Sequence, residues 1–186
     1  PRNICHEHLE FYNFKSLKYL FEKCGLKIFK IEENNVNGGS YRIYCKKNIK
    51  KSISYKEKTS IKYIKQFIKN IKINKLKCVS FINKEIKKNK KIFLYGASTK
   101  GNTTLQYYKI DNTKIQFASE RSPEKWGKYT IGTGIKIISE KQARKYNPDY
   151  FLVMPYGFIN EFIKREESWR KKGGKFILPY PKFKIV

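Results

Sequence analysis

The sequence lacks the features that would place it in a membrane or on a secretory route. It has no run of the roughly 18 apolar residues that a membrane-spanning helix needs, and it does not open with the charged and then apolar segments of a secretory signal. Its 186 residues fit one large domain or two small ones, and 40% of them are hydrophobic. We therefore predict a folded, soluble, cytoplasmic protein.

Cysteine and histidine are scarce, which limits the metal and redox chemistry open to the chain. The four cysteines, Cys5, Cys24, Cys45 and Cys78, lie far apart in the sequence. None belongs to a CxxC pair of the kind found in zinc sites and redox motifs. We predict that they are reduced, small core residues.

Arginine is also scarce, although the chain is strongly basic. Its 42 basic and 15 acidic residues give a formal net charge of +27, but only six of the basic residues are arginine. Lysine, asparagine and isoleucine are enriched together, which is typical of an AT-rich genome. Residues 46 to 91 hold 17 lysines against two acids. A basic nucleic-acid-binding protein is an open alternative, but this segment lacks the interleaved aromatics of a base-stacking platform.

The first part of the chain has the pattern of a helix followed by two strands. Apolar spacing predicts a helix from Ser16 to Cys24, capped by Ser16 and ended by Gly25. Alternation then predicts antiparallel strands over 26–31 and 41–45. Because a lone hairpin is marginal in water, we expect residues 1–46 to complete a sheet begun upstream.

The remainder divides into a connector and an α/β domain. Residues 47–90 carry apolar stripes at helical spacing over 61–71 and 76–88, which predict a Lys-rich helical connector. From residue 91 onward, strands are predicted at 92–95, 115–118, 150–154 and 176–178, and helices at 102–109, 139–146 and 158–172. Alternating strands and helices favour a parallel, Rossmann-like sheet over residues 91–186.

A glycine-bounded turn joins the first strand and helix of that domain. It does not match a P-loop, because Lys100 precedes Gly101 instead of following it, and it lacks the central glycine of a dinucleotide fingerprint, where Ser98 stands. Such a turn still directs Ser98 and Lys100 above the sheet. Contact with an anion or a sugar nucleotide and a simple strand-to-helix turn are both open. Glu120, at the end of the second strand, is either a ligand of a ribose hydroxyl or a solvated loop acid beside Arg121.

The densest titratable cluster, Cys5-His6-Glu7-His8, lies at the start of the chain. A metal site would need a further ligand at compatible spacing, and the sequence offers no obvious one. A histidine beside an acid suits proton transfer near neutral pH. A structural pair of histidines is the alternative.

Five segments in fixed order resemble one family, the nucleotide-sugar C-methyltransferases that act on deoxy-4-ketosugars. They are Ile4–Tyr12, Asn37–Arg42, Gly96–Thr103, Glu120–Lys128 and Tyr150–Pro155. The resemblance covers nearly the whole chain. It implies that residues 1–46 end an S-adenosylmethionine domain and that residues 91–186 are the Rossmann-like C-terminal domain.

The resemblance also implies partners and site residues. S-adenosylmethionine and zinc would be bound by upstream domains, so this chain alone would bind neither and would be inactive as a fragment; the substrate would be a nucleoside-diphosphate (NDP) sugar. It further implies that His8 is the base, with Glu7 in support and His6 a second candidate. Many relatives have Tyr where this chain has Cys5. The residues that would contact the sugar, the phosphates or the ribose are Asn37, Arg42, Ser98, Lys100, Glu120 and Arg121. A non-catalytic Rossmann-like domain that binds sugar nucleotides is a further alternative.

Overall fold

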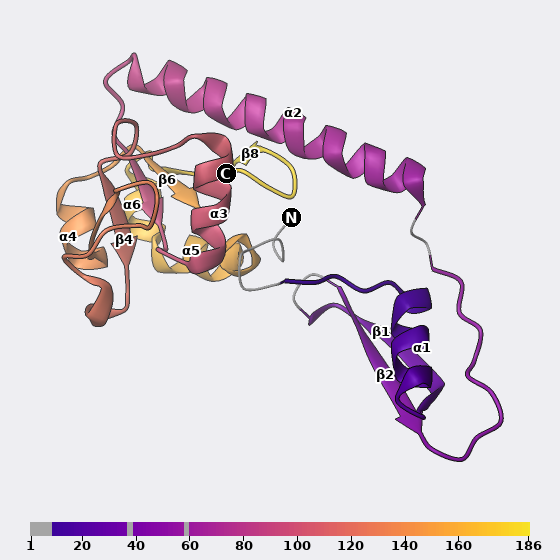
Figure 1. The fold of residues 1–186 in the computed structure, drawn as a ribbon. Helices are drawn as coiled ribbons and strands as arrows, with labels where there is room; N and C mark the ends of the chain where they lie inside the picture. The colour runs from indigo at the N-terminus through magenta and orange to yellow at the C-terminus, as the bar shows by residue number, and fades with distance from the viewer. Residues whose placement is uncertain (1–8, 37–38, 58–59) are drawn as a thin grey trace. The chain divides into compact units, whose positions relative to one another are not determined.

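In the computed structural model the described residues are 9–36, 39–57 and 60–186, and they form two compact units. The smaller unit extends to Ile64, and the larger begins at Lys65 and contains a six-stranded sheet with its helices (Figure 1). Within the described ranges, every helix is too short or too polar to span a bilayer.

Helix α1 (Phe14–Lys23) opens the smaller unit and begins earlier than predicted. Its N-cap is Asn13, whose side-chain oxygen accepts a hydrogen bond from the Ser16 N–H at 2.8 Å. The Ser16 hydroxyl in turn accepts from the Asn13 N–H at 3.2 Å. Ser16 is therefore the third residue of a capping box and not the cap itself. Gly25 follows the helix with φ +73°, the left-handed conformation predicted for it.

The two predicted strands of this unit form an antiparallel hairpin. Strand β1 (Lys27–Asn34) pairs with β2 (Ser40–Lys46). The Ile28 N–H donates to Ser52 Oγ at 3.1 Å, which ties the segment after β2 back to the hairpin. Among the described residues of this unit, Phe14 and Ile28 are the only buried apolar side chains.

One continuous helix, α2 (Ile61–Ile86), replaces the two helical stretches predicted for the connector. The sequence of α2 contains no glycine or proline, so no helix-breaking residue separates the two predicted stretches. Asn74 fastens α2 to the end of the chain: its amide group donates to the Pro181 carbonyl at 2.7 Å, and its side-chain oxygen accepts from the Phe183 N–H at 3.0 Å.

The three cysteines within the described ranges are free thiols of different burial. Cys78 on α2 is fully buried, and burial raises the pKa of its thiol to about 12. Cys45 is half-buried. Cys24 is exposed at the end of α1, so the prediction of a core position is wrong for this residue. Cys5 lies outside the described residues.

The larger unit has the α/β class that the sequence predicts. Its strands lie in the order β5-β4-β3-β6-β7-β8, and all pairings are parallel except that of β7 with β8. The prediction missed β5, which leads straight into a helix, and β8, which has only two residues. The mostly parallel sheet is compatible with a Rossmann-like architecture. The bounds are β3 (Ile92–Tyr95), β4 (Phe117–Glu120), β5 (Lys136–Ser139), β6 (Tyr150–Val153), β7 (Lys175–Leu178) and β8 (Lys184–Ile185).

Helices cover both faces of this sheet and bury a core on each. On one face α2 and α3 pack over Leu94 and its neighbours, and on the other α4, α5 and α6 pack over Phe151 and its neighbours (Figure 1). The helix predicted over 158–172 divides at Glu166, whose side chain is buried. The bounds are α3 (Thr99–Tyr108), α4 (Glu140–Lys145), α5 (Ile159–Arg165) and α6 (Glu167–Lys171).

Candidate functional site

Four predicted site residues lie outside the described residues: His6, Glu7, His8 and Asn37. Their roles stay predictions.

Arg42, the other site residue predicted in this half of the chain, lies on β2 opposite Glu32 of β1. Its Nη1 is 3.6 Å from Glu32 Oε2, and the arginine side chain is 65% exposed. The same Glu32 accepts a hydrogen bond from Tyr44 at 2.9 Å and pairs with Lys30 at 2.6 Å. Arg42 therefore makes a surface ion pair across the hairpin, and its guanidinium remains accessible to a ligand.

An open pocket lies within the smaller unit, between α1 and the turn end of the hairpin. Its lining includes Phe21, Glu33 and Tyr41. The Glu33 carboxylate accepts a hydrogen bond from the Tyr55 hydroxyl, which raises the pKa of Tyr55. Tyr41 packs edge-on against Tyr55, with the ring centroids 5.6 Å apart. The pocket thus combines aromatic walls with a carboxylate of fixed orientation.

The remaining predicted residues, Ser98, Lys100, Glu120 and Arg121, lie at the carboxyl edge of the parallel sheet. They follow or end β3 and β4, which are parallel neighbours. The strand order reverses beside β3, because β4 and β5 lie on one side of it and β6 and β7 on the other. Open α/β sheets bind their ligands at this edge, next to such a reversal. The structure therefore brings these four residues to one place where ligands are expected.

Ser98 has a structural task at this edge. It is the N-cap of α3, and its hydroxyl accepts a hydrogen bond from the Gly101 N–H at 3.1 Å. Gly101 packs against Met154 so closely that an added Cβ would lie 2.9 Å from that side chain. Gly96 has φ +82°, and its missing Cβ would lie 3.1 Å from Pro155. The two glycines therefore let the turn pack directly on the end of β6.

Glu120 is bound to the same turn and is not a solvated loop acid. Its Oε2 accepts from the Ala97 N–H at 2.9 Å, and its Oε1 accepts from the N–H groups of Arg121 at 2.9 Å and Ser122 at 3.1 Å. Its side chain is only 13% exposed. The carboxylate therefore occupies an N–H group of the turn that an anionic ligand would otherwise use. The predicted contact with a ribose hydroxyl stays a prediction.

Lys125 and Trp126 also lie at this edge. Both belong to the Glu120–Lys128 segment that carries the resemblance, but sequence reasoning assigned neither a role. The Lys125 ammonium donates to the Ala97 carbonyl at 3.3 Å and lies 3.7 Å from Glu120 Oε2. The Trp126 indole N–H donates to the Glu120 carbonyl at 2.9 Å. The residues next to Lys125 in the sequence give no sign of its contacts with Ala97 and Glu120. These contacts form only because the folded loop returns to β4.

Arg121 is the most accessible cation of this group. Its side chain is 71% exposed, and its Nη1 lies 4.0 Å from Glu161 Oε1 on α5. Lys100, in the first turn of α3, is half-buried. Both can reach a ligand that approaches the edge from solvent.

A second polar cluster lies on the opposite side of β3, among α4, α5 and α6. The buried Glu166 carboxylate accepts from Arg144 Nη2 at 2.5 Å and from the Tyr95 hydroxyl at 2.7 Å. Burial alone would raise the pKa of Glu166, but these hydrogen bonds outweigh it and lower the pKa. Burial and then Glu166 raise the pKa of Tyr95. Arg165 joins the cluster through Glu140 at 3.1 Å. The cluster joins three helices to the last residue of β3, which makes it structural.

The described residues contain no group of three His, Cys, Asp or Glu side chains that could hold a metal ion. In the Gly96–Gly101 turn, Glu120 already binds the Ala97 N–H, and Met154 fills the space beside Gly101.

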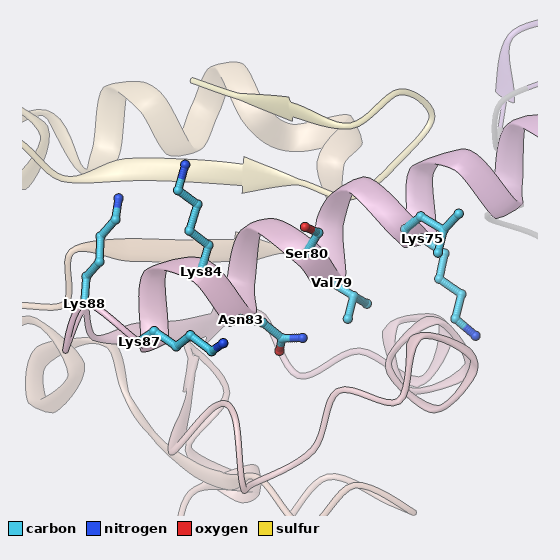
Figure 2. Close-up of a pocket in the computed structure, with 8 residues that line it drawn as sticks. Lys75, Val79, Ser80, Asn83, Lys84, Lys87 and Lys88 are labelled. Carbon is cyan, nitrogen blue, oxygen red and sulfur yellow. The ribbon is translucent and has the colours of Figure 1, made fainter.

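A lysine-rich groove runs along the C-terminal half of α2. Lys84 and Lys88 extend to one side of the helix, whereas Lys75 and Lys87 extend to the other (Figure 2). Lys88 pairs with Glu85 at 2.7 Å, and Lys75 lies over the Tyr107 ring at 4.4 Å. This is the surface that a polyanion would meet.

Comparisons with known proteins identify a family and a relative. A model of the family described as the C-methyltransferase C-terminal domain matches residues 35–181. The C-methyltransferase NovU of Streptomyces niveus is 26% identical over an alignment of 195 positions, which covers 98% of this chain and 46% of NovU. The chain therefore spans about half the length of the curated relative that it matches.

Proposed function

This chain belongs to the C-methyltransferase C-terminal domain family, and from that membership we propose that it is the C-terminal part of an S-adenosylmethionine-dependent C-methyltransferase. The proposed substrate is a nucleoside-diphosphate-linked 4-keto-deoxysugar. The observation that carries the proposal is the extent of the family match, which runs from residue 35 to residue 181 and so includes β2 and the carboxyl edge of the sheet.

In this proposal the acceptor sugar is activated by a base at the start of the chain. His8 takes the proton from the carbon beside the ketone, and the electron pair of that C–H bond moves toward the ketone oxygen to give an enolate. Glu7 orients the imidazole, and His6 is the second candidate for the base. An imidazole suits this task because it titrates near neutral pH. Many relatives have Tyr where this chain has Cys5, and the thiol of a cysteine lacks the reach and the hydroxyl of tyrosine.

The same proposal assigns the nucleotide end of the substrate to the larger unit. Lys100 and Arg121 are cations at the carboxyl edge that would meet the diphosphate. Asn37 and Arg42 would contact the sugar or a phosphate. The accessibility of Arg121 and Arg42 supports these assignments.

The methyl donor and zinc are assigned to protein outside these 186 residues. NovU is about twice as long as the segment it shares with this chain, which supports the proposal of further domains. S-adenosylmethionine supplies the methyl group when bound there, and this chain supplies the base and the acceptor site.

The test is a substitution of the proposed base in the longer protein. His8→Asn removes the imidazole with little change in volume, and we expect the rate of methyl transfer to fall by about 10²–10⁴-fold. Glu10→Gln, an exposed acid two positions away, is the control and should leave the rate unchanged. Near-normal turnover of His8→Asn would exclude His8 as the base.

The lysine groove of α2 favours a second candidate, a protein that binds nucleic acid through this helix. It predicts affinity for duplex DNA that falls steeply with salt, by about 0.9 log units per log unit of salt for each phosphate neutralised. Absence of binding at moderate salt would exclude this candidate. If DNA binding persists, and the logarithm of its affinity falls by several units per log unit of salt, the nucleic-acid-binding candidate would be favoured over the methyltransferase.

A further inference from the structure

We propose that Glu120 and Lys125 are positioning residues that together hold the Gly96–Lys100 turn in the conformation that binds the diphosphate of the substrate. The inference rests on the proposed function for the class of ligand. It differs from that proposal in two ways. Glu120 holds the turn instead of contacting the ribose, and Lys125 is assigned the same task.

The two side chains bind the two polar backbone groups of one residue of the turn, Ala97. Glu120 accepts from the Ala97 N–H at 2.9 Å, while Lys125 donates to the Ala97 carbonyl at 3.3 Å. The carboxylate and the ammonium lie 3.7 Å apart. Both polar groups of the Ala97 backbone are thus fixed by charged partners, and such hydrogen bonds are stronger than neutral ones.

Within the described residues, the Glu120–Lys125 ion pair is the only one that either side chain forms. Glu120 is 13% exposed, so it loses most of its hydration, and the cation beside it and the N–H groups of Ala97, Arg121 and Ser122 together compensate for that loss. Lys125 is 41% exposed, so part of its side chain is covered. Removing either side chain would break one of the two hydrogen bonds to the Ala97 backbone and would leave the other charge without its ion-pair partner.

The loop that carries Lys125 is fixed on both sides, so the lysine is held in place before any ligand arrives. The Trp126 indole N–H donates to the Glu120 carbonyl at 2.9 Å. The Gly127 N–H donates to the Ile137 carbonyl of β5 at 2.9 Å. A rigid loop lowers the cost of ordering on binding, which is the advantage of a preorganised site.

The arrangement explains how a turn without the usual glycine pattern can still be a ligand-binding turn. The Gly96 N–H donates to the Ser119 carbonyl at 2.8 Å, and the Glu120 carboxylate takes the Ala97 N–H. In this proposal, Ser98, Thr99 and Lys100, at the start of α3, are the residues that meet the ligand. The diphosphate is expected there, beyond Ser98, and not at Ala97. The loss of the Glu120–Lys125 pair should therefore weaken binding without removing any atom that touches the ligand.

The experiment measures binding of uridine diphosphate and of thymidine diphosphate, each in turn, to the 186-residue chain by calorimetry. Glu120→Gln and Lys125→Met are each expected to raise Kd about tenfold, which corresponds to about 1.4 kcal/mol. Lys125→Arg should restore most of the affinity, since it keeps the charge. The double variant should lose no more than either single variant, because the two residues act as a pair.

Two exposed residues of the same loop provide matched controls. Glu124→Gln removes an exposed acid that accepts a hydrogen bond from the Ser122 hydroxyl, and Lys128→Met removes an exposed lysine. Both variants should bind the nucleotides like the wild type. All variants are measured at a temperature where circular dichroism shows them folded. The Ala97 amide proton is also followed by NMR, since it should shift upfield in Glu120→Gln whether or not ligand is present.

The outcomes separate this inference from the proposed function. Unchanged Kd in both Glu120→Gln and Lys125→Met, with a wild type that binds, would overturn the inference and leave the proposed function intact. No binding of either nucleotide by the wild type would overturn the inference, and the proposed function would then be decided by the His8→Asn experiment in the longer protein. A variant that loses thermal stability but keeps its Kd would show a structural role alone and would also overturn the inference. If Glu120→Gln does not fold, Lys125→Met and Lys125→Arg decide the question.

Discussion

The two units of the molecule differ in how much of their apolar surface they bury by themselves. The larger unit covers both faces of its sheet and buries side chains such as Leu94 and Phe151 almost completely. The smaller unit buries Phe14 and Ile28 among its described residues and leaves Leu20 and Phe29 each 43% exposed. The larger unit thus has a core of its own, whereas a helix on a hairpin with so little buried surface is marginal. We expect the smaller unit to open locally at a much lower free energy than the larger.

The largest expected effect comes from the core of the larger unit. Leu94→Ala should cost about 2–5 kcal/mol of unfolding free energy, because it leaves a cavity beneath α2 and α3 where the leucine is 1% exposed. Leu76→Ala, at a leucine 70% exposed on α2, is the matched control and should change stability by less than about 0.5 kcal/mol. Urea unfolding followed by tryptophan fluorescence reports this unit, since Trp126 and Trp169 both lie in it.

The same fluorescence transition tests whether the two units unfold independently. Ile28 is as buried as Leu94, but it lies in the smaller unit. Ile28→Ala should therefore leave the tryptophan transition nearly unchanged. A shift as large as that of Leu94→Ala would show that the two units unfold together.

The next effect concerns the buried ion cluster of the larger unit. Glu166→Gln should lower the free energy of unfolding by about 2–3 kcal/mol. Breaking a fully buried ion pair costs about 3–5 kcal/mol, and the loss is smaller here because the Arg144 side chain is 38% exposed. The folded pKa of Glu166 lies below its unfolded value, so the stabilisation is complete above the unfolded pKa and is lost as pH falls through the folded pKa. The difference between wild type and variant should therefore shrink in acid when stability is measured by urea unfolding across pH.

Glu167→Gln is the control for that experiment. Glu167 is 66% exposed and forms a surface ion pair with Lys171 at 2.9 Å, so its removal should be nearly neutral. A loss for Glu166→Gln that does not depend on pH would argue that packing, and not the charge, is responsible.

The smallest effect compares one helix cap in each unit. Asn13→Ala and Ser139→Ala each remove a side-chain acceptor from a helix N-terminus and should cost about 1 kcal/mol. In the smaller unit this loss should raise amide exchange throughout α1, because little else holds that helix. In the larger unit exchange of α4 should rise only locally. Equal protection losses in both helices would contradict the difference between the units.

Sequence patterns predicted the elements that repeat a local signal and missed those that depend on distant contacts. The alternation of strands and helices after residue 91 identified β3, β6 and β7, and the hairpin followed from two alternating runs. Strand β5 was missed because it leads straight into α4, and β8 was missed because a two-residue strand shows no periodicity of its own. The break at Glu166 comes from bonds to Arg144 and Tyr95, which no local pattern reveals.

The candidate site divides in the same way. The sequence placed Ser98, Lys100, Glu120 and Arg121 after successive strands, and parallel pairing brings them to one edge. It did not distinguish ligand contacts from internal ones, since the bond from Ala97 to Glu120 joins residues 23 positions apart. Lys125 lies in the Glu120–Lys128 segment that carries the resemblance, but the sequence predicted no role for it, because its contacts with Ala97 and Glu120 form only in the folded loop.

The most direct test of the account is hydrogen exchange of the chain with and without uridine diphosphate or thymidine diphosphate, read by mass spectrometry. We predict that the nucleotide slows exchange in peptides covering residues 96–104 and 120–127, at the carboxyl edge of the sheet, and leaves the lysine groove of α2 unchanged. Protection confined to α2, or none at the carboxyl edge under saturating nucleotide, would contradict the assignment of the nucleotide site to the larger unit.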